Sequence, residues 1–361
     1  MDGLDLVRRR MRVQGLTGEP FATPVEVVRS LGAVQAQEFA ETKWSLGERV
    51  RGHDDAAVER AFADGEILRT HALRPTWHFV AAEDIRWILS LTAPRVHAAN
   101  GYPYRRFELD DALLARTDEL LKETLADGEP RTRKELAAAL ADAGIPDASG
   151  FRLAYIVMHA ELEAVICSGP RRGAQHTYLL VEQRAPGAVE LDGEEALAEL
   201  TRRYFGGHGP ATVRDYAWWS GLTLADARAG IVLAGLQEID DGYLGTPDAA
   251  SRDPGPGGAF LIPTYDESTI AFKEHRVVLA AEPPRAGPLQ RPLVIDGVTF
   301  GSWKRVAAKD QVTVEVTLFA RLGAAELRAV EEAVERFGAF AGVPAQLETQ
   351  LAAPDGLGLS K

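Results

Sequence analysis

The order of apolar and polar residues predicts short helices that alternate with short strands. Apolar residues recur at helical spacing over 153–160 and again over 225–233. Segments rich in β-branched and aromatic residues occur at 67–80, 165–181 and 236–239. Three parts of the chain therefore each predict a helix, a tight turn, a second helix and an extended segment.

Three helix starts share one sequence pattern, in which a threonine precedes an acidic residue by three positions. The threonine side chain can accept the third helical N–H, while the acid reaches back to the cap and interacts favourably with the helix dipole. A glycine follows each short helix. The three sets are Thr23, Glu26 and Gly32; Thr132, Glu135 and Gly144; and Thr212, Asp215 and Gly221.

A helix, a turn, a second helix and a β-hairpin make a winged helix, a variant of the motif that places its second helix in a DNA groove. We therefore expect three winged-helix units in tandem, at 1–110, 111–190 and 191–258. The alternative is a helical protein whose well-capped helices are unrelated. In the second unit, a hairpin with a basic tip is predicted at Arg171 and Arg172.

The C-terminal third changes character. Residues 246–260 are rich in Gly, Pro, Asp and Ser, which indicates a long loop, and Asp296-Gly297 indicates a tight hairpin turn. An amphipathic helix is expected at 324–341. Short strands are expected at 260–262, 277–279, 292–295, 298–300 and 312–319. The sequence thus predicts an α+β fold that ends in a small β-barrel with a covering helix at 259–345 and a loose tail at 346–361.

Composition excludes several classes of protein. The chain has no run of 18 apolar residues and no signal-peptide order at its start, so we expect a cytoplasmic protein that does not span a membrane. Cys167 is the single cysteine, which excludes an internal disulfide and a multi-cysteine metal site. No His-x-x-x-His pair on a helix and no Cys/His grouping has metal spacing, so no metal and no cofactor are predicted.

The charge is unevenly distributed. The formal net charge of −13 argues against general affinity for polyanions, because non-specific DNA affinity comes from neutralised phosphates. Residues 1–106 hold 15 basic and 14 acidic residues, whereas the remainder holds 25 and 39. The N-terminal third is therefore the expected place for an anion to approach. Elsewhere, local patches would be needed, and the basic residues that could line one face are Arg131, Arg133, Lys134, Arg171, Arg172, Arg202, Arg203 and Arg214.

The most unusual local sequence is Gln35-Ala36-Gln37. Glutamines at i and i+2 point the same way only where the backbone is extended or turning, because on a helix they diverge by about 200°. Amides both donate and accept hydrogen bonds, so the pair could hold one water without titrating. Taken alone, the pair is more simply explained as a solvated turn.

A second candidate lies at 71–79. On a strand, Arg74, Thr76 and His78 would share one face, while Trp77 and Phe79 would share the other. Such a strand could have core behind it and a phosphate or a base in front. The alternative is an edge strand whose arginine and histidine meet nearby carboxylates.

Two further segments have plainer explanations. The motif at 263–267, followed by Lys273, His275 and Arg276, is either a basic loop after a strand or ordinary surface, and surface is favoured. Trp218 and Trp219 fall within the first helix of the third unit, where core and interface packing is the favoured role over a stacking platform.

Several short motifs together resemble one known family. In this order, and over about residues 4 to 342, the chain resembles the AlkZ/YcaQ-type winged-helix DNA glycosylases. The motifs are Val34-Gln35-Ala36-Gln37, Ser45-Leu46-Gly47-Glu48-Arg49, Leu73-Arg74-Pro75-Thr76-Trp77-His78, Ala211-Thr212 through Trp219-Ser220-Gly221-Leu222, Leu261-Ile262-Pro263-Thr264-Tyr265-Asp266-Glu267, and Gly301-Ser302-Trp303-Lys304.

The resemblance implies three tandem winged helices and a β-barrel around a concave DNA-binding surface. It implies a monofunctional enzyme that removes N7- or N3-alkylated purines and in some members unhooks interstrand crosslinks. Gln35 and Gln37 would be the catalytic pair, in the Gln-x-Gln branch of the family. The candidate contacts to DNA or to the lesion are Arg74, Thr76, His78, Arg171, Arg172, Lys273 and Arg276.

Glutamines suit this chemistry. An alkylated purine is cationic and leaves as a neutral base, so the main task is to place a water on the sugar carbon. We expect a monomer that acts on double-stranded DNA with alkylated bases at the nucleoid. Two alternatives stay open: a non-catalytic winged-helix DNA-binding regulator or resistance protein, and a protein–protein scaffold.

Overall fold

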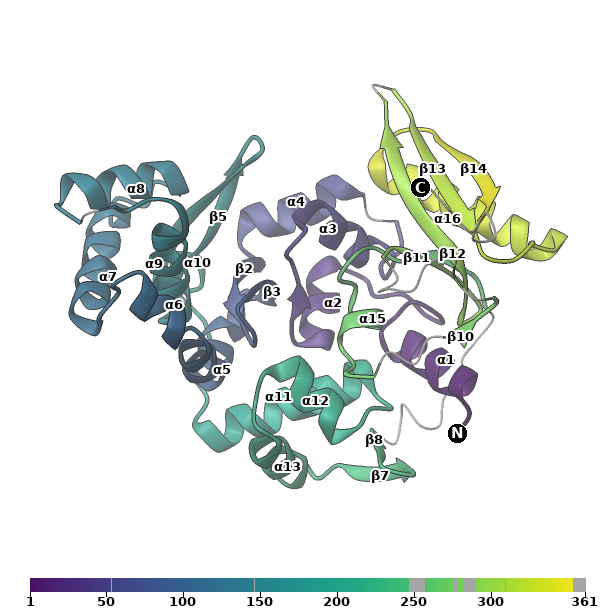
Figure 1. The fold of residues 1–361 in the computed structure, drawn as a ribbon, viewed down its shortest axis with the longest axis horizontal. Helices are drawn as coiled ribbons and strands as arrows, with labels where there is room; N and C mark the ends of the chain where they lie inside the picture. Colours follow the sequence, from purple (N-terminus) through teal and green to yellow (C-terminus); the bar gives the residue numbers. More distant parts are fainter. Residues whose placement is uncertain are drawn as a thin grey trace, which may run out of the picture.

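The fold is a mixture of helices and short sheets, arranged as three repeated units and a C-terminal sheet (Figure 1). A helix, α1 (Gly3–Val13), precedes the units and begins at Asp2, whose side chain accepts the N–H of Asp5 at 2.8 Å. The computed structural model describes residues 1–52, 54–145, 147–246, 257–274, 278–281, 283, 290–308 and 310–352.

The first two units repeat one order of elements: helix, strand, helix, helix, strand, strand. Within the described residues, the third unit has the same order without the first strand. The first unit contains α2 (Pro24–Leu31), β1 (Val34–Gln35), α3 (Phe39–Gly47), α4 (Asp55–Asp64), β2 (Ile67–Ala72) and β3 (Thr76–Ala81). The second contains α7 (Asp111–Leu125), β4 (Arg131–Thr132), α8 (Arg133–Asp142), α9 (Gly150–Leu162), β5 (Ile166–Arg172) and β6 (Gln175–Leu180). The third contains α11 (Gly193–His208), α12 (Val213–Ser220), α13 (Leu224–Leu233), β7 (Gln237–Asp240) and β8 (Tyr243–Gly245).

The sheets repeat as well. In the first unit the strand order is β1-β3-β2, and in the second it is β4-β6-β5, with all pairs antiparallel. In the third unit β7 pairs with β8, and a single bridge from Ala211 to Leu244 occupies the place of the first strand. Short segments connect the units: η1 (Ala82–Asp84), α5 (Ile85–Ala99), α6 (Gly101–Arg106) and α10 (Val181–Arg184).

The predicted repeat of helix caps needs one correction. Thr132 and Thr212 form capping boxes at α8 and α12, the second helices of their units, as their sequence pattern predicts. Thr23 instead caps α2, the first helix of its unit, and Glu26 bonds the N–H of Ala22 rather than that of the cap. A threonine followed by an acid three residues later predicts that a helix begins there. It does not predict which helix of the unit this is.

The C-terminal strands form an open sheet, so the predicted closed barrel is not confirmed. The strand order is β14-β13-β12-β11-β9, and β10 pairs with β12. The helix α16 has the predicted bounds and packs against both β9 and β14, so its apolar face covers the core that barrel closure would otherwise enclose. The elements are β9 (Ala259–Leu261), α15 (Glu267–Ile270), β10 (Val278–Leu279), β11 (Pro292–Ile295), β12 (Val298–Ala307), β13 (Val312–Leu318), α16 (Ala324–Ala341) and β14 (Ala345–Leu351).

One detail of this region agrees with the expectations and one differs. The Asp296-Gly297 turn forms as predicted, with positive φ at both residues. Residues 346–351, expected in a tail, instead belong to β14, which pairs in parallel with β13 along its whole length. The strand forms because Ala345 and Leu347 pack against the core beneath α16.

The hydrophobic cores join the first unit to its neighbours on two sides. One core runs from α2, α3 and α4 into the C-terminal sheet, where Trp44 meets Phe337 and Phe340 edge-on or tilted. A second core joins the other face of the first unit to α11 and α12. The second unit has a core of its own, which also receives Phe107 and Leu109. Because side chains pack across the predicted domain boundaries, the cores do not show where one domain ends and the next begins. The boundaries stay a prediction.

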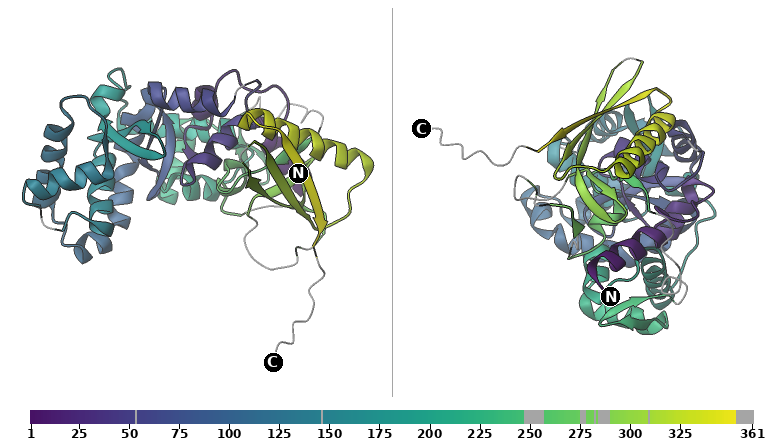
Figure 2. Two further views of the ribbon diagram at one scale, coloured as in Figure 1. Left: turned by 90° about the horizontal axis from the view of Figure 1, so that it is seen from above. Right: turned by 90° about the vertical axis from the view of Figure 1, so that its right-hand side faces the viewer.

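The molecule is elongated, with the second unit at one end and the C-terminal sheet at the other (Figure 2). The first unit lies between them, and the third unit lies below it in the view of Figure 1. Within the part of the chain that the structure describes, no helix combines the length and apolar character needed to cross a membrane.

Candidate active site

The glutamine pair lies where the first strand of the first unit leads into α3. Gln35 ends the two-residue strand β1 and is paired with His78 of β3, while Gln37 lies in the three-residue link before α3. The link leaves Gln35 buried, at 7% exposure, and Gln37 half-buried. The backbone is extended at Gln35 and bends at Gln37, so it meets the condition under which the two side chains can point the same way.

Three hydrogen bonds hold Gln35. Its backbone N–H donates to Glu267 Oε1 at 2.8 Å, and its carbonyl accepts from Thr42 Oγ1 at 3.1 Å. Its side-chain Oε1 accepts from Arg74 Nη2 at 2.9 Å. Because the oxygen of the amide faces Arg74, the NH₂ group of the same amide remains available to donate on the opposite side.

The rest of the motif is held by β3 and by one arginine of β2. The N–H of Ala36 donates to the carbonyl of Trp77 at 2.7 Å, and Gln37 Oε1 lies 3.4 Å from the N–H of Trp77. Arg69 Nε donates to the carbonyl of Ala36 at 2.9 Å, and its guanidinium lies 4.3 Å from the centre of the Trp77 ring. Burial lowers the pKa of Arg69 to about 10, which still leaves it a cation at neutral pH.

A buried acid supports Gln35 from beneath. Glu267, at the start of α15, is fully buried, and its second oxygen accepts from the indole N–H of Trp219 at 2.9 Å. The preceding Asp266 is also fully buried and forms a two-point pair with Arg49 at 2.8 Å. Burial opposes ionisation of Asp266, yet the charge and hydrogen bonds of Arg49 hold its pKa below the usual value.

This finding corrects the expectation for residues 263–267, which is neither a basic loop nor simple surface. Two of its five residues are buried acids that join the C-terminal region to the first unit. Between them and the strand, Tyr265 has a φ of 62° and is 41% exposed. A tyrosine in the left-handed region is strained, and such strain is found most often at functional sites.

Arg74 lies in the turn between β2 and β3, not on a strand face as predicted. Leu73, beside it, has a φ of 59°, and a Cβ atom added to Gly221 would lie 2.2 Å from the Leu73 carbonyl. Only glycine permits this close approach between the hairpin and the end of α12. As a result, the Arg74 guanidinium lies 5.5 Å from the centre of the Trp218 ring, and burial lowers the pKa of Arg74.

The structure places Thr76 and His78 behind the glutamines. His78 is fully buried and its Nδ1 lies 2.9 Å from the carbonyl of Thr76. Burial, and then the charge of Arg74, lowers the pKa of His78 to about 3, so it stays neutral. Among the described residues, neither His78 Nε2 nor Thr76 Oγ1 has a hydrogen-bond partner. His78 therefore supports the strand pair and is not placed to contact DNA as a cation.

The two arginines of the β5–β6 hairpin have different surroundings. The Arg171 guanidinium lies 4.7 Å from the centre of the Phe39 ring, at the start of α3, and so approaches the glutamine link. Arg172 bonds to Glu135 at 2.8 Å and to the carbonyl of Pro130 at 2.7 Å, within its own unit. Burial, followed by the charges of Arg69 and Arg171, lowers the pKa of the nearby His176 to about 4.

The other predicted basic contacts do not join the glutamines. Lys273 is exposed, and its backbone N–H donates to Asp215 Oδ1 at 2.9 Å; Arg276 lies outside the described residues. Several arginines expected to line one face are paired with acids: Arg131 with Asp127, Arg172 with Glu135, Arg202 with Glu199, and Arg203 with Asp84. Arg202 and Arg203 are on α11, which lies far from the β5–β6 hairpin (Figure 1).

Arg69 was not singled out from the sequence, and Trp218, Tyr265 and Glu267 were named there but not placed beside the glutamines. The alternation of Arg69 and His71 along β2 could have suggested a polar face. Trp218 is 46% exposed, whereas Trp219 is buried, so the favoured core role holds for only one of the pair. No local signal predicts that Glu267 meets Gln35, which lies 232 residues away.

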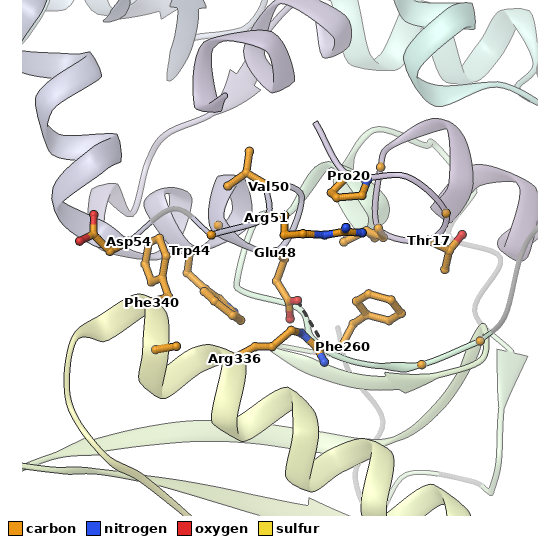
Figure 3. A pocket seen from close by; sticks show the side chains of 18 residues that line it. Thr17, Pro20, Trp44, Glu48, Val50, Arg51, Asp54, Phe260, Arg336 and Phe340 are labelled. Carbon is orange, nitrogen blue, oxygen red and sulfur yellow. Dashed lines mark ion pairs between the residues drawn. The ribbon is translucent and has the colours of Figure 1, made fainter. Parts of the chain in front are cut away.

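A separate pocket of about 570 Å³ lies between the loop after α1, the end of α3 and α16 (Figure 3). Aromatic side chains of Trp44, Phe260 and Phe340 line it, together with Glu48 and Arg336. The Glu48 carboxylate is buried, 3.8 Å from Arg336, and burial raises its pKa to about 7. Neither glutamine of the motif lines this pocket.

Comparison with known proteins settles the family. A family model described as "DNA glycosylase AlkZ-like" matches residues 28–340. The chain belongs to the AlkZ-like DNA glycosylase family. It is therefore an enzyme of the class that hydrolyses the N-glycosidic bond between a base and its sugar in DNA.

This AlkZ-like chain is similar in sequence and in structure to glycosylases of one organism. It is 27% identical to the "Interstrand DNA cross-link repair glycosylase" of Streptomyces sahachiroi, over 92% of this chain and 95% of the relative. The solved structure of Streptomyces sahachiroi DNA glycosylase AlkZ has the same fold, with a TM-score of 0.79 and 23% identity over 98% of this chain and 100% of that one.

Proposed function

We propose that this AlkZ-like chain is a monofunctional DNA glycosylase that removes N7- and N3-alkylated purines, with Gln35 and Gln37 as its catalytic pair. The observation that carries the proposal is the number of long-range hydrogen bonds on the motif. Glu267, Arg74 and Arg69 each reach it from another element. A solvated turn would not require such support, whereas a preorganised site does.

In the proposed reaction, the bond between the sugar C1′ and the cationic purine breaks, and its electron pair neutralises the ring. The base leaves without a proton from the enzyme. A water oriented by the two amides forms the new bond to C1′ and releases its proton to solvent, which leaves an abasic sugar. The glutamines stay uncharged throughout, so they do not repel the developing positive charge on the sugar.

The surroundings of the motif support binding of the DNA backbone. Arg74 and Arg171 lie around the link, each beside an aromatic ring, Trp218 and Phe39, while the buried Arg69 adds positive charge from beneath. Arginine on an aromatic plane can meet phosphate or stack with a base. We further infer that the three units are winged helices, with the β2–β3, β5–β6 and β7–β8 hairpins as wings.

A lysine in the first unit bears on the monofunctional assignment. Enzymes that also cleave the DNA strand use an amine that attacks the sugar. Lys43 of α3 is buried and its Nζ is bonded to Asp55 at 2.7 Å and to Glu59 at 2.8 Å. Its charge is thus held by two acids, and it is not available as a nucleophile.

The experiment uses duplex DNA that carries one N7-methylguanine, with free base and alkali-sensitive sites as the two readouts. We expect Gln35→Ala and Gln37→Ala each to slow base release by about 100-fold, since each removes part of the alignment of the water. DNA affinity should stay within about threefold, because neither amide neutralises a phosphate. Gln346→Ala, on the exposed face of β14, serves as the matched control.

Two outcomes would overturn the proposal. Undiminished release by the double variant would remove the glutamines from the mechanism. Tight binding by the wild-type chain without any release above the spontaneous rate would favour the alternative, a DNA-binding regulator or a resistance protein.

We also propose interstrand crosslinks as substrates. The support is the cross-link repair activity in the name of the Streptomyces relative. A crosslinked base is attached to both strands and could not enter a closed pocket. Unhooking of a single N7–N7 crosslink on a denaturing gel tests this part, and its failure would leave the proposal for single alkylated bases intact.

A further inference from the structure

Two histidines and a glutamate lie together where the end of the first unit meets the second. His97 is in the last turn of α5, His159 is in the last turn of α9, and Glu163 caps α9. Their potential ligand atoms all lie within 4.8 Å of one another. The helices α5, α6, α7 and α9 gather at this end of the molecule (Figure 1), apart from the glutamine link.

The contact between His97 and Glu163 has an unusual geometry. His97 Nε2 lies 2.9 Å from Glu163 Oε1, but the two atoms are poorly aligned for a hydrogen bond. A ring nitrogen and a carboxylate oxygen that lie side by side without pointing at each other can both point at a third atom. This is the arrangement of two ligands of one metal ion.

The remaining ring nitrogens are fixed as they are in metal sites. His97 Nδ1 lies 2.8 Å from the hydroxyl of Tyr104, and His159 Nδ1 lies 3.3 Å from Asp118 Oδ2. Metal-binding histidines characteristically bond their second nitrogen to a carboxylate or another polar group, which fixes the tautomer and the ring orientation. Here these partners leave the second nitrogen of each ring available as a metal ligand.

We propose that His97, His159 and Glu163 form a zinc site. Zinc accepts nitrogen and oxygen ligands at about 2.0–2.2 Å, which places tetrahedral ligands roughly 3.4 Å apart. The present separations need only small rotations of side chains to reach that value, and the half-exposed Glu163 is free to make them. His97 and Glu163 also line a pocket of about 410 Å³, which leaves a fourth position open to water.

Such a site would join the first unit to the second. His97 is the contribution of α5, and both other ligands belong to α9, which also packs against β2. Zinc would thus fix the angle between two units whose hairpins flank the glutamine link. The inference concerns stability and geometry and does not depend on which base the enzyme removes.

The test uses the full-length protein without a histidine tag, stripped with a chelator and titrated with zinc sulfate by calorimetry. We expect one equivalent to bind and the Tm to rise on the order of 5 °C when zinc is well above its Kd. Co²⁺ in place of zinc should give the intense visible absorption of a tetrahedral site. His97→Ala, His159→Ala and Glu163→Gln should each abolish or strongly weaken all three signals.

Two variants keep the test decisive even if a histidine variant unfolds. Asp118→Asn removes no ligand and should weaken zinc binding by about tenfold through the orientation of His159. Glu123→Gln, at an exposed position of α7, should bind zinc like the wild type. The absence of stoichiometric binding, or equal binding by folded Glu163→Gln, would overturn the proposal.

Discussion

The first and second units have the same order of helices and strands, but they differ at the joint between the first strand and the next helix. In the second unit, Thr132 both ends β4 and caps α8 through a capping box with Glu135. In the first unit, three residues separate β1 from α3, and the cap position, Glu38, makes no side-chain cap. The glutamine motif occupies this joint.

The comparison shows two ways to secure the same joint. A capping box is local and needs only residues three positions apart. The joint of the first unit is instead held from β2, β3 and α15, and its own side chains take almost no part in capping. Support from outside leaves two amides available for chemistry. The third unit, with Thr212 and Asp215, follows the local solution.

The largest expected effect comes from removal of the external support. Glu267→Ala would leave the N–H of Gln35 and the indole N–H of Trp219 buried without acceptors. We expect the free energy of unfolding to fall by about 3 kcal/mol. Urea unfolding measures it, with base release followed in parallel. A loss no larger than that of a helix cap would mean that the joint is not held in this way.

The next effect concerns the other end of α3, where Glu48 is buried. Below pH 4.5 the carboxyl is protonated in both folded and unfolded chains. As pH rises from 4.5 to about 7, the unfolded chain loses the proton first, so stability falls, and above pH 7 the loss is constant. Glu48→Gln should remove this dependence and stabilise the protein by about 2 kcal/mol at pH 8, part of the gain being offset by Arg336.

The same variant supplies its own control. At pH 4 the wild type and Glu48→Gln should unfold at the same urea concentration, since both carry a neutral side chain. A stabilisation that is equal at pH 4 and pH 8 would show that packing, not ionisation, is responsible.

A smaller effect is expected at the locally capped joint. Thr132→Ala removes the cap of α8 and should lower the free energy of unfolding by about 1 kcal/mol. Base release should be unchanged, because Thr132 does not contact the joint that carries the glutamines. Loss of activity in a stably folded Thr132→Ala protein would contradict the view that the joint before α8 is only structural and that the joint before α3 carries the proposed chemistry.

The smallest effect separates two neighbouring arginines of the β5–β6 hairpin. Arg171→Gln should weaken DNA binding by about threefold and reduce the slope of log affinity against log salt by about 0.9, as one phosphate contact would. Arg172→Gln should change both less, since Arg172 is paired with Glu135 at 2.8 Å within its own unit, whereas Arg171 lies beside the glutamine link and its ion pair with Glu59 is longer, at 3.4 Å. Salt-dependent binding titrations compare them, and a reversed order would show that the hairpin turns its other side to DNA.

Local patterns predicted most of the secondary structure, because they depend on neighbours in sequence. The bounds of α16, the Asp296-Gly297 turn and the basic hairpin of the second unit all follow from such patterns. The open sheet did not, since barrel closure depends on how β9 and β14 meet α16. The prediction that Thr23 caps a helix from Pro24 is confirmed, but the position of that helix as the first of its unit also depends on tertiary structure.

The site was predictable only in part. The spacing of Gln35 and Gln37 allowed a non-helical backbone that is extended or turning, whereas the burial of His78 and the place of Arg74 in a turn depend on tertiary packing. Glu267 could not be assigned from an acid in a loop. The proposed zinc ligands have no local sequence pattern. A His-x-x-x-His pair places both ligands on one helix, whereas His97 and His159 are on two helices.

The contact between Gln35 and Glu267 sets a time at which the enzyme can first act. Glu267 follows Gln35 by 232 residues, and ribosomes add about 5–20 residues per second. A nascent chain would therefore carry the proposed catalytic glutamines for on the order of ten seconds or more before their support exists. Fragments that end before residue 267 should fold their first helices and yet release no alkylated base from DNA.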